Sequence, residues 1–143
     1  MTQCRINLDN TSYKEIDYSV LDSSYYKDVV EIYKQYCDYK KFNSVLPIFV
    51  EELENKTCEL LGYYHNNKLI AFSMMNLYTS KQSVFSEQFA WNYENPQLKL
   101  GYNSIRSECA RYKRLGYKYL YIGEYNTYKR ELKGFEQVGT LDV

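Results

Sequence analysis

The fold is decided by a stretch near the middle of the chain, Leu60-Leu61-Gly62-Tyr63-Tyr64-His65-Asn66-Asn67-Lys68-Leu69-Ile70-Ala71-Phe72. Two apolar runs flank a short polar turn, and asparagine tolerates the positive φ angles that tight hairpin turns require. The pattern therefore predicts an antiparallel hairpin with strands over residues 58–64 and 68–78. The only histidine of the chain, His65, lies beside this turn, so we interpret it as a turn residue and not as a catalyst.

Outward from the hairpin, apolar periodicity and turn signals predict the other elements. On the C-terminal side these are a strand over 83–93, a helix over about 104–115, a strand over 117–124, a short turn or helix over 126–132 and a strand from 135 to 143. On the N-terminal side, capping side chains at 22–24 precede a helix that runs to about residue 41, and a second helix runs from about Pro47 to Asn55. Residues 4–8 and 15–20 fit either short strands or an irregular lead-in. Together these elements predict an α/β (α+β) fold with a mixed, mostly antiparallel sheet.

Composition places the chain among ordinary globular proteins. Its 143 residues are 45% apolar and 25% charged, which predicts a single domain over residues 1–143. No apolar run approaches the roughly 20 residues that span a bilayer, and the first residues lack the pattern of a signal peptide. We therefore expect a cytoplasmic protein without a membrane partner.

Cysteine spacing argues against a metal site. The four cysteines, at positions 4, 37, 58 and 109, include no pair with the close spacing of zinc ligands. Cys37 and Cys109 fall on the apolar stripes of predicted helices, where a free thiol acts as a small hydrophobic side chain. We expect four reduced, structural cysteines and no metal.

Basic charge is concentrated in one part of a neutral chain. The chain has 18 basic and 18 acidic residues, yet residues 97–134 hold nine basic against three acidic ones, a net charge of +6. This segment includes Gly101 and the start of the predicted 104–115 helix, where unpaired amides and the helix dipole favour a phosphate group. Lys99 or Arg106 could add charge there. The alternative is an ordinary solvated helix face.

Two further residues are candidates for acid–base chemistry. On an ideal strand Glu87 shares a face with Phe85, Phe89 and Trp91, and desolvation there would raise its pKa toward that of a general base. A bulge or a strand edge would instead leave Glu87 in water. Tyr128, which follows a predicted strand and lies near Asn126, could protonate a leaving group.

Several segments resemble the GCN5-related N-acetyltransferase (GNAT) superfamily. The hairpin over Leu60–Phe72 is similar to its central hairpin, and Gly134-Phe135-Glu136-Gln137-Val138-Gly139 is similar to its "GFxxVG" closing strand. The stretches Leu100–Ile105 and Gly116–Gly123, with the later Tyr128-Lys129, also resemble the GNAT-like C-terminal domain of arginyl- and leucyl-tRNA–protein transferases. The matches cover about residues 58–140 in the expected order.

The resemblance implies a mixed sheet flanked by helices on both faces, and a splayed strand pair, here 83–93 and 117–124, that admits an acyl donor. The donor pyrophosphate would lie on the loop Gln97–Ser104. The motif of that loop, Q/R-x-x-G-x-G/A, keeps one glycine here, in Leu98-Lys99-Leu100-Gly101-Tyr102-Asn103. The residues implied in donor binding are Trp91, Gln97, Lys99, Gly101, Tyr102, Asn103, Ser104 and Asn126.

Two functions remain open at this point. In the first, the protein is an N-acyltransferase whose donor is acetyl-CoA, another acyl-CoA, or an aminoacyl-tRNA bound by segment 97–134. Glu87 would accept the amine proton, amides after Trp91 would polarise the carbonyl, and Tyr128 would protonate the leaving group. In the second, it is a catalytically inactive binding or assembly protein that acts through a tyrosine-rich interface, for example as a homodimer, because 18 of its 25 aromatic residues are tyrosine.

Overall fold

The computed structural model describes residues 3–41, 57–124 and 127–139. In chain order its main elements are β1 (Gln3–Asn7), β2 (Ser19–Leu21), α1 (Tyr26–Lys40), β3 (Cys58–His65), β4 (Lys68–Tyr78), β5 (Ser83–Trp91), α3 (Leu100–Arg114), β6 (Tyr119–Glu124) and β7 (Phe135–Val138). Five short 3-10 segments are interspersed: η1 (Leu8–Asn10), η2 (Ser23–Tyr25), η3 (Thr79–Lys81), η4 (Pro96–Leu98) and η5 (Thr127–Glu131). The predicted second helix, Pro47 to Asn55, lies outside the described residues.

The strands form one seven-stranded sheet in the order β2-β3-β4-β5-β6-β1-β7. The pairs β2–β3, β1–β6 and β1–β7 are antiparallel, whereas β5 and β6 are parallel. Parallel neighbours need a crossover connection, and α3 provides it between β5 and β6. The predicted mixed, mostly antiparallel α/β sheet is therefore confirmed.

The residues gather in two compact units. Unit 1 comprises Met1–Ile16, Asn76–Glu87 and Ser104–Val143, and unit 2 comprises Asp17–Met75 and Gln88–Asn103. Strands β4 and β5 each contribute residues to both units. The prediction of one domain over residues 1–143 stays a prediction.

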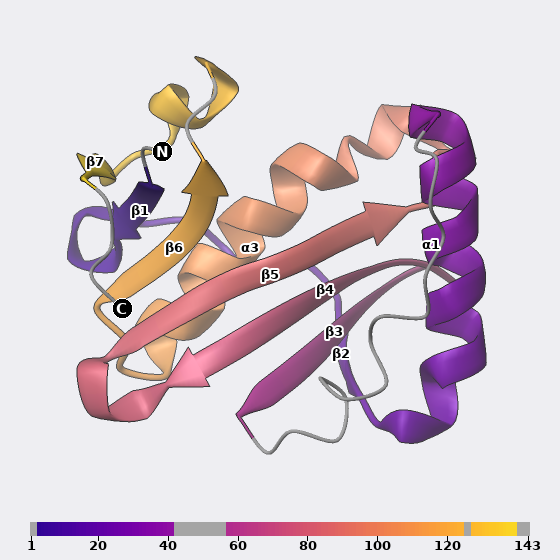
Figure 1. Ribbon diagram of the computed structural model, residues 1–143, viewed down its shortest axis with the longest axis horizontal. Helices are drawn as coiled ribbons and strands as arrows, with labels where there is room; N and C mark the ends of the chain where they lie inside the picture. The colour runs from indigo at the N-terminus through magenta and orange to yellow at the C-terminus, as the bar shows by residue number, and fades with distance from the viewer. Residues whose placement is uncertain (1–2, 42–56, 125–126, 140–143) are drawn as a thin grey trace. The chain divides into compact units, whose positions relative to one another are not determined.

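Unit 2 is built on the predicted hairpin. Asn66 and Asn67 connect β3 to β4 with φ angles of 51° and 64°, as expected for a two-residue turn with two positive φ angles. Figure 1 shows α1 beside the end of the hairpin where this turn lies. Buried side chains of α1 and of the strands form a common core: Leu21, Val29, Ile32, Leu60, Phe72, Met74 and Ala90.

Helix α1 confirms the helix predicted up to about residue 41. The Asp22 carboxylate accepts a hydrogen bond of 2.9 Å from the Ser24 amide and caps η2, which leads into the helix. Lys41 ends α1 in the left-handed conformation, with φ 60° and ψ 39°. The apolar spacing that predicted the helix also predicted its buried face, since Val29 and Cys37 are fully buried.

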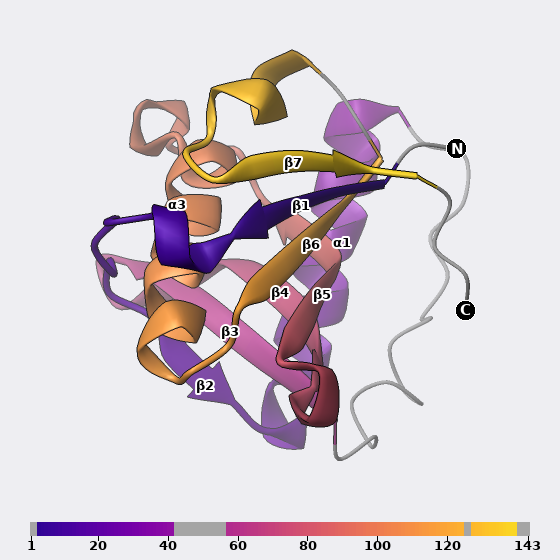
Figure 2. The same cartoon turned by 90° about the vertical axis from the view of Figure 1, so that its left-hand side faces the viewer.

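Unit 1 places β1 between β6 and β7, and Figure 2 shows β1 and β7 side by side. The Asn7 amide donates to the Gly134 carbonyl at 2.8 Å. A Cβ atom on Gly134 would collide with the Asn7 carbonyl, and the φ of +78° at Gly134 also favours glycine.

All four cysteines are free, as predicted, and Cys4, Cys37 and Cys109 are buried. Within the described ranges, no helix has both the length and the apolar character needed to cross a membrane.

Three predicted boundaries are wrong: the strand predicted from residue 117 begins at Tyr119, and the other two lie near the candidate site. The strand predicted to reach residue 93 ends at Trp91, and Tyr93 has a positive φ of 59° that an extended strand does not allow. The helix predicted from Ser104 begins at Leu100, because Lys99 ends η4 in the left-handed conformation and its carbonyl starts the helical hydrogen bonds. The presumed loop at Gly101–Asn103 is thus the first turn of α3.

Candidate functional site

The parallel ladder between β5 and β6 is short. It joins Ser83, Val84 and Phe85 to Tyr119, Leu120 and Tyr121. Phe85 and Tyr121, the last pair, stack with ring centroids 4.4 Å apart. In the described chain β5 continues to Trp91 and β6 to Glu124 without further pairs in this ladder. The parallel ladder thus ends at the pair Phe85 and Tyr121, and the splayed strand pair stays a prediction.

Beyond the last pair of the β5–β6 ladder, side chains donate hydrogen bonds to strand carbonyls. In unit 2 the Asn92 amide donates to the Ile70 carbonyl at 3.0 Å, so alternation along β5 directs the carbonyl of Phe89 to the edge opposite β4. Gln88 Nε2 donates to that carbonyl at 2.9 Å. A side-chain amide thus occupies a position that a neighbouring strand would otherwise fill.

A side chain also donates a hydrogen bond to a strand carbonyl on β6, in unit 1. The register of β6 against β1 passes from Tyr121 opposite Arg5 to Gly123 opposite Cys4, so Ile122 is the extra residue of a β-bulge. Lys129 Nζ donates to the Ile122 carbonyl at 2.7 Å. Sequence reasoning did not single out this role for Lys129, although it noted the Tyr128-Lys129 pair, because the bulge depends on pairing with the distant strand β1.

The first turn of α3 presents backbone amides. The Asn103 amide donates to the Lys99 carbonyl at 2.9 Å and the Tyr102 amide to the same carbonyl at 3.1 Å. The amides of Leu100 and Gly101 precede these bonds and therefore have no acceptor within the helix. The first turn contains no acidic residue, so the positive end of the helix dipole is not neutralised there.

The side chains at this turn leave its start accessible. Tyr102 is 46% exposed, and the Asn103 side-chain amide donates to the Leu98 carbonyl at 2.8 Å, which braces the end of η4. Lys99 and Gln97 are exposed. Ser104 is 1% exposed, and in the described part of the chain its Oγ has no hydrogen-bond partner. Amides, a nearby ammonium group and an orphaned buried hydroxyl together fit a phosphate-bearing ligand.

Glu87 is exposed to solvent. Of the two readings that the sequence left open, the structure therefore shows the one that leaves the carboxylate in water. Asn76 Nδ2 contacts Glu87 Oε1 at 3.5 Å, and the same amide nitrogen donates to the Tyr78 hydroxyl at 3.2 Å. The role of Glu87 as a general base stays a prediction.

The amides that follow Trp91 are largely engaged. Asn92 donates its amide to Ile70, and Glu94 donates its amide to Asn92 Oδ1 at 3.1 Å. Both amides therefore already have acceptors in this structure, and the role of amides after Trp91 in polarising a bound carbonyl stays a prediction. Trp91 is buried, with its ring centroid 4.6 Å from that of Tyr93.

An aromatic cluster that the sequence did not predict holds this end of β5. Tyr93 stacks on Tyr39 with ring centroids 3.9 Å apart and planes inclined by 14°, and Tyr36 lies 6.2 Å from the same ring. Both partners come from the last turns of α1. The positive φ of Tyr93 turns its ring into this cluster, which no local sequence signal indicates.

The other predicted acid–base residue is only partly visible. Tyr128 belongs to η5, but its side chain, like all of Asn126, lies outside what the structure describes. Their roles in protonating a leaving group and in donor binding stay predictions.

Much of the basic charge of segment 97–134 is used within unit 1. Arg114 forms two hydrogen bonds of 2.9 Å with the Glu15 carboxylate, Lys113 donates to the Thr11 carbonyl, and Lys129 donates to Ile122. The Arg106 guanidinium lies 5.5 Å from the centre of the Tyr13 ring. Of these contacts only Arg114–Glu15 is an ion pair that offsets charge, whereas the others hold the basic side chains in place. Among the described residues no group of three or more His, Cys, Asp or Glu side chains is placed to hold a metal ion.

Comparisons with known proteins identify the architecture. No protein-family model matches the chain, and no curated protein sequence does either. One solved structure with this fold is the C-terminal DUF2156 domain of a lysylphosphatidylglycerol synthetase from Agrobacterium fabrum, with a TM-score of 0.64 and 11% identity over 85% of this chain. Another is a protein assigned to the GNAT family as an acetyltransferase from Novosphingobium aromaticivorans, with a TM-score of 0.62 and 13% identity over 96% of this chain. The chain has a GNAT-like fold.

A third structure with this GNAT-like fold is a conserved protein of unknown function from Staphylococcus epidermidis, with a TM-score of 0.58 and 12% identity over 96% of the chain. The chain spans 46%, 60% and 57% of the lengths of these three structures. At such identities the likeness concerns the fold alone. The fold resemblance expected from the hairpin and the closing strand is confirmed.

Proposed function

We propose that this protein is an N-acyltransferase that moves an acyl group from an acyl-CoA to an amine. The observation that carries the proposal is the first turn of α3, where the amides of Leu100 and Gly101 lack helical acceptors and no acid opposes the dipole. The GNAT-like fold supports it, since α3 is the first α-helix after β5 in the chain and is joined to it through η4. Bound there, acyl-CoA would supply an acyl group activated as a thioester.

Residues of the chain divide the remaining tasks. The Leu100 and Gly101 amides and the exposed ammonium of Lys99 would hold the pyrophosphate, and the Ser104 hydroxyl would give it a further donor. Tyr102, exposed in this turn, and Gln97, exposed in the preceding η4, would flank the bound donor, and Trp91 belongs to the same proposed site. Asn126 belongs to the same proposed donor site.

Proton transfer falls to two side chains. The Glu87 carboxylate would accept the amine proton, and its contact with Asn76 would orient it. Tyr128 would protonate the leaving group. The Asn92 and Glu94 amides are engaged, so another backbone amide near Trp91 would orient the acyl carbonyl.

Among donors, the engaged basic side chains favour acyl-CoA over aminoacyl-tRNA. RNA binding depends on many phosphate contacts from free Lys and Arg, and Arg114, Lys113 and Lys129 already have partners inside the protein. Localisation in the cytoplasm would suit either donor.

A second candidate function is binding or assembly without catalysis. It is favoured by the exposure of Tyr39, Tyr64, Tyr78 and Tyr102, since tyrosine is enriched at interfaces. A homodimer through such a surface would show as a doubled mass in light scattering, with no response to acyl-CoA.

A thermal-shift series tests the proposed function. Acetyl-CoA and free CoA should each raise the melting temperature, because a ligand of the native state stabilises it by mass action. Whole tRNA should have little effect, and a tRNA shift that falls steeply with added salt would instead indicate an aminoacyl-tRNA donor. No shift with CoA or acetyl-CoA at saturating concentration would refute the proposal.

A further inference from the structure

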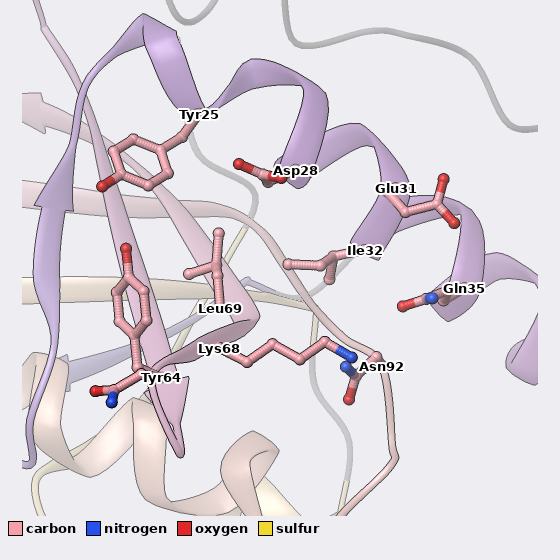
Figure 3. Close-up of a pocket in the computed structure, with 10 residues that line it drawn as sticks. Tyr25, Asp28, Glu31, Ile32, Gln35, Tyr64, Lys68, Leu69 and Asn92 are labelled. Carbon is pink, nitrogen blue, oxygen red and sulfur yellow. The ribbon is translucent and has the colours of Figure 1, made fainter.

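A groove of about 480 Å³ lies in unit 2 between α1 and the turn of the β3–β4 hairpin. Asp28, Glu31 and Gln35 come to it from one face of α1, because residues three and four apart lie on the same side of a helix. Figure 3 shows Lys68 and Asn92 on the facing side. Asn92 directly follows Trp91, so the groove reaches the end of β5.

The groove carries a negative charge. Asp28 and Glu31 are exposed carboxylates on its rim. Lys68, the only basic side chain among the described lining residues, is paired with Glu94, whose carboxylate oxygens lie 3.1 and 3.3 Å from its Nζ. Glu94 partly offsets the charge of Lys68, and no other basic side chain among the described lining residues compensates the two carboxylates of α1.

The floor and the near wall of the groove differ in character from this rim. Ile32 is 3% exposed, and it belongs with half-buried Leu69 to the apolar core of unit 2. On the near wall, the hydroxyls of Tyr25 and Tyr64 point toward one another. Partial burial of its ring, the hydrogen bond with Tyr25 and the nearby charge of Asp28 raise the pKa of Tyr64 to about 12, so it stays a neutral hydrogen-bonding group.

We propose that this groove binds a protonated amine carried on an alkyl chain, with the ammonium group at Asp28 and Glu31 and the methylene groups over Ile32 and Leu69. The chemistry of the lining selects such a ligand. Carboxylates attract an ammonium ion, an apolar floor favours methylene groups, and Gln35 and Asn92 offer neutral hydrogen-bonding groups beside them.

The next step rests on the proposed function: the groove then defines the acceptor of the acyl group as a diamine. A carboxylate stabilises the protonated form of a nearby amine, whereas an amine must be deprotonated to attack an acyl carbon. The ammonium held by Asp28 and Glu31 is therefore the one that does not react. The second amine, at the other end of the alkyl chain, extends past Asn92 to the end of β5.

Calorimetric titration of the full chain with 1,5-diaminopentane, at low salt and without any acyl donor, tests the binding. The diamine should bind more tightly than pentylamine, and 1,5-pentanediol and glutarate should not bind. Asp28→Asn and Glu31→Gln should each weaken binding about twofold to fivefold, as expected for exposed charge pairs. Lys68→Gln should strengthen it by a similar factor, because it removes a positive charge from the lining and frees Glu94.

Asp17→Asn, which removes an exposed carboxylate elsewhere in unit 2, is the matched control and should leave the affinity unchanged. Equal weakening by Asp17→Asn, or no strengthening by Lys68→Gln, would overturn the proposal, and the gain expected from Lys68→Gln cannot come from misfolding.

Transfer assays separate the acceptor role from the binding site. With acetyl-CoA, Glu31→Gln should raise KM for the diamine and leave kcat unchanged. Diamine binding with the expected variant pattern, but without transfer to any amine, would uphold the cation site and refute its acceptor role together with the proposed function.

Discussion

Lys129 Nζ donates a hydrogen bond of 2.7 Å to the carbonyl of Ile122, the residue that β6 adds opposite the step from Cys4 to Arg5. The bond satisfies a carbonyl that the β1 ladder does not pair. It also ties η5, the segment that contains Tyr128, to the end of β6. In the proposed enzyme this contact would help to position η5, which contains the proposed acid Tyr128.

Replacing Lys129 tests that role. Lys129→Met keeps the aliphatic part of the side chain but leaves the partly buried Ile122 carbonyl without its donor, which should cost about 1–2 kcal/mol of unfolding free energy. Urea denaturation measures the loss. Lys133→Met, at an exposed lysine of the same region, serves as the control and should change stability by less than about 0.5 kcal/mol. Equal losses in the two variants would show that the bond to Ile122 contributes nothing specific.

The hairpin of unit 2 leaves no room for a side chain at Gly62. A Cβ atom there would lie 2.7 Å from Leu21 Cδ1 and 2.8 Å from Leu69 Cδ1. Gly62→Ala should therefore destabilise the protein by about 1–3 kcal/mol through overpacking. Gly139→Ala is the matched control, because nothing lies within 4 Å of its Cβ position. Chemical denaturation of both variants tests the contrast, and a neutral Gly62→Ala would contradict the packing described for β2, β3 and β4.

Stability should fall at alkaline pH. Burial, with the charge of Glu108 adding to it, raises the pKa of the Cys109 thiol from 9.0 to about 12. The unfolded chain then releases this proton at a lower pH than the native chain, so the free energy of unfolding decreases as pH rises from about 9 toward 12. Denaturation curves measured across this window should show a shallower decline in Cys109→Ala than in the parent protein. An unchanged pH slope in the variant would exclude Cys109 as a source of the decline.

The cysteines should also differ in the rate at which a thiol reagent labels them. At pH 8 Cys58, which is only half-buried, should react with a soluble disulfide reagent before Cys109 does, because reactivity follows thiolate content and access. Mass spectrometry of partly labelled native protein identifies the site. Early labelling at Cys109 would contradict its burial in α3.

Glu87 is the residue on which the proposed proton transfer depends. Glu87→Gln preserves the contact with Asn76 in shape but removes the base, and should lower kcat by about 10²-fold with little change in stability, because the side chain is exposed. Asp9→Asn, an exposed acid of η1 in the same unit, should retain full activity. Steady-state transfer assays distinguish the two. Full activity of Glu87→Gln would remove Glu87 from the mechanism.

Local signals in the sequence predicted much of the fold. The Asn66-Asn67 turn specifies its hairpin through backbone preferences of those two residues, and the apolar spacing of α1 specifies its buried face. The start of α3 was misplaced because a lysine in the left-handed conformation, Lys99, gives no sequence signal. The sequence could not decide whether Glu87 is buried, because strand alternation alone does not say which face of a strand is covered.

Long-range pairing explains what the sequence did not reveal. The place of β1 between β6 and β7 and the bulge at Ile122 depend on residues more than a hundred positions apart. The groove lined by Asp28, Glu31 and Lys68 likewise combines a helix with a distant hairpin. Such features follow from tertiary packing and not from any local pattern.

The central claim, that the first turn of α3 binds the phosphate groups of the donor, is tested most directly by calorimetric titration of CoA into Lys99→Glu and Lys133→Glu. Both variants reverse one exposed charge in the basic segment, but only the first places an acid at the start of α3. Lys99→Glu should weaken CoA binding about threefold to tenfold, as expected for a charge beside a helix N-terminus, and Lys133→Glu should leave it within about twofold of the parent protein. Equal CoA affinity in the Lys99→Glu variant and the parent protein would contradict the claim.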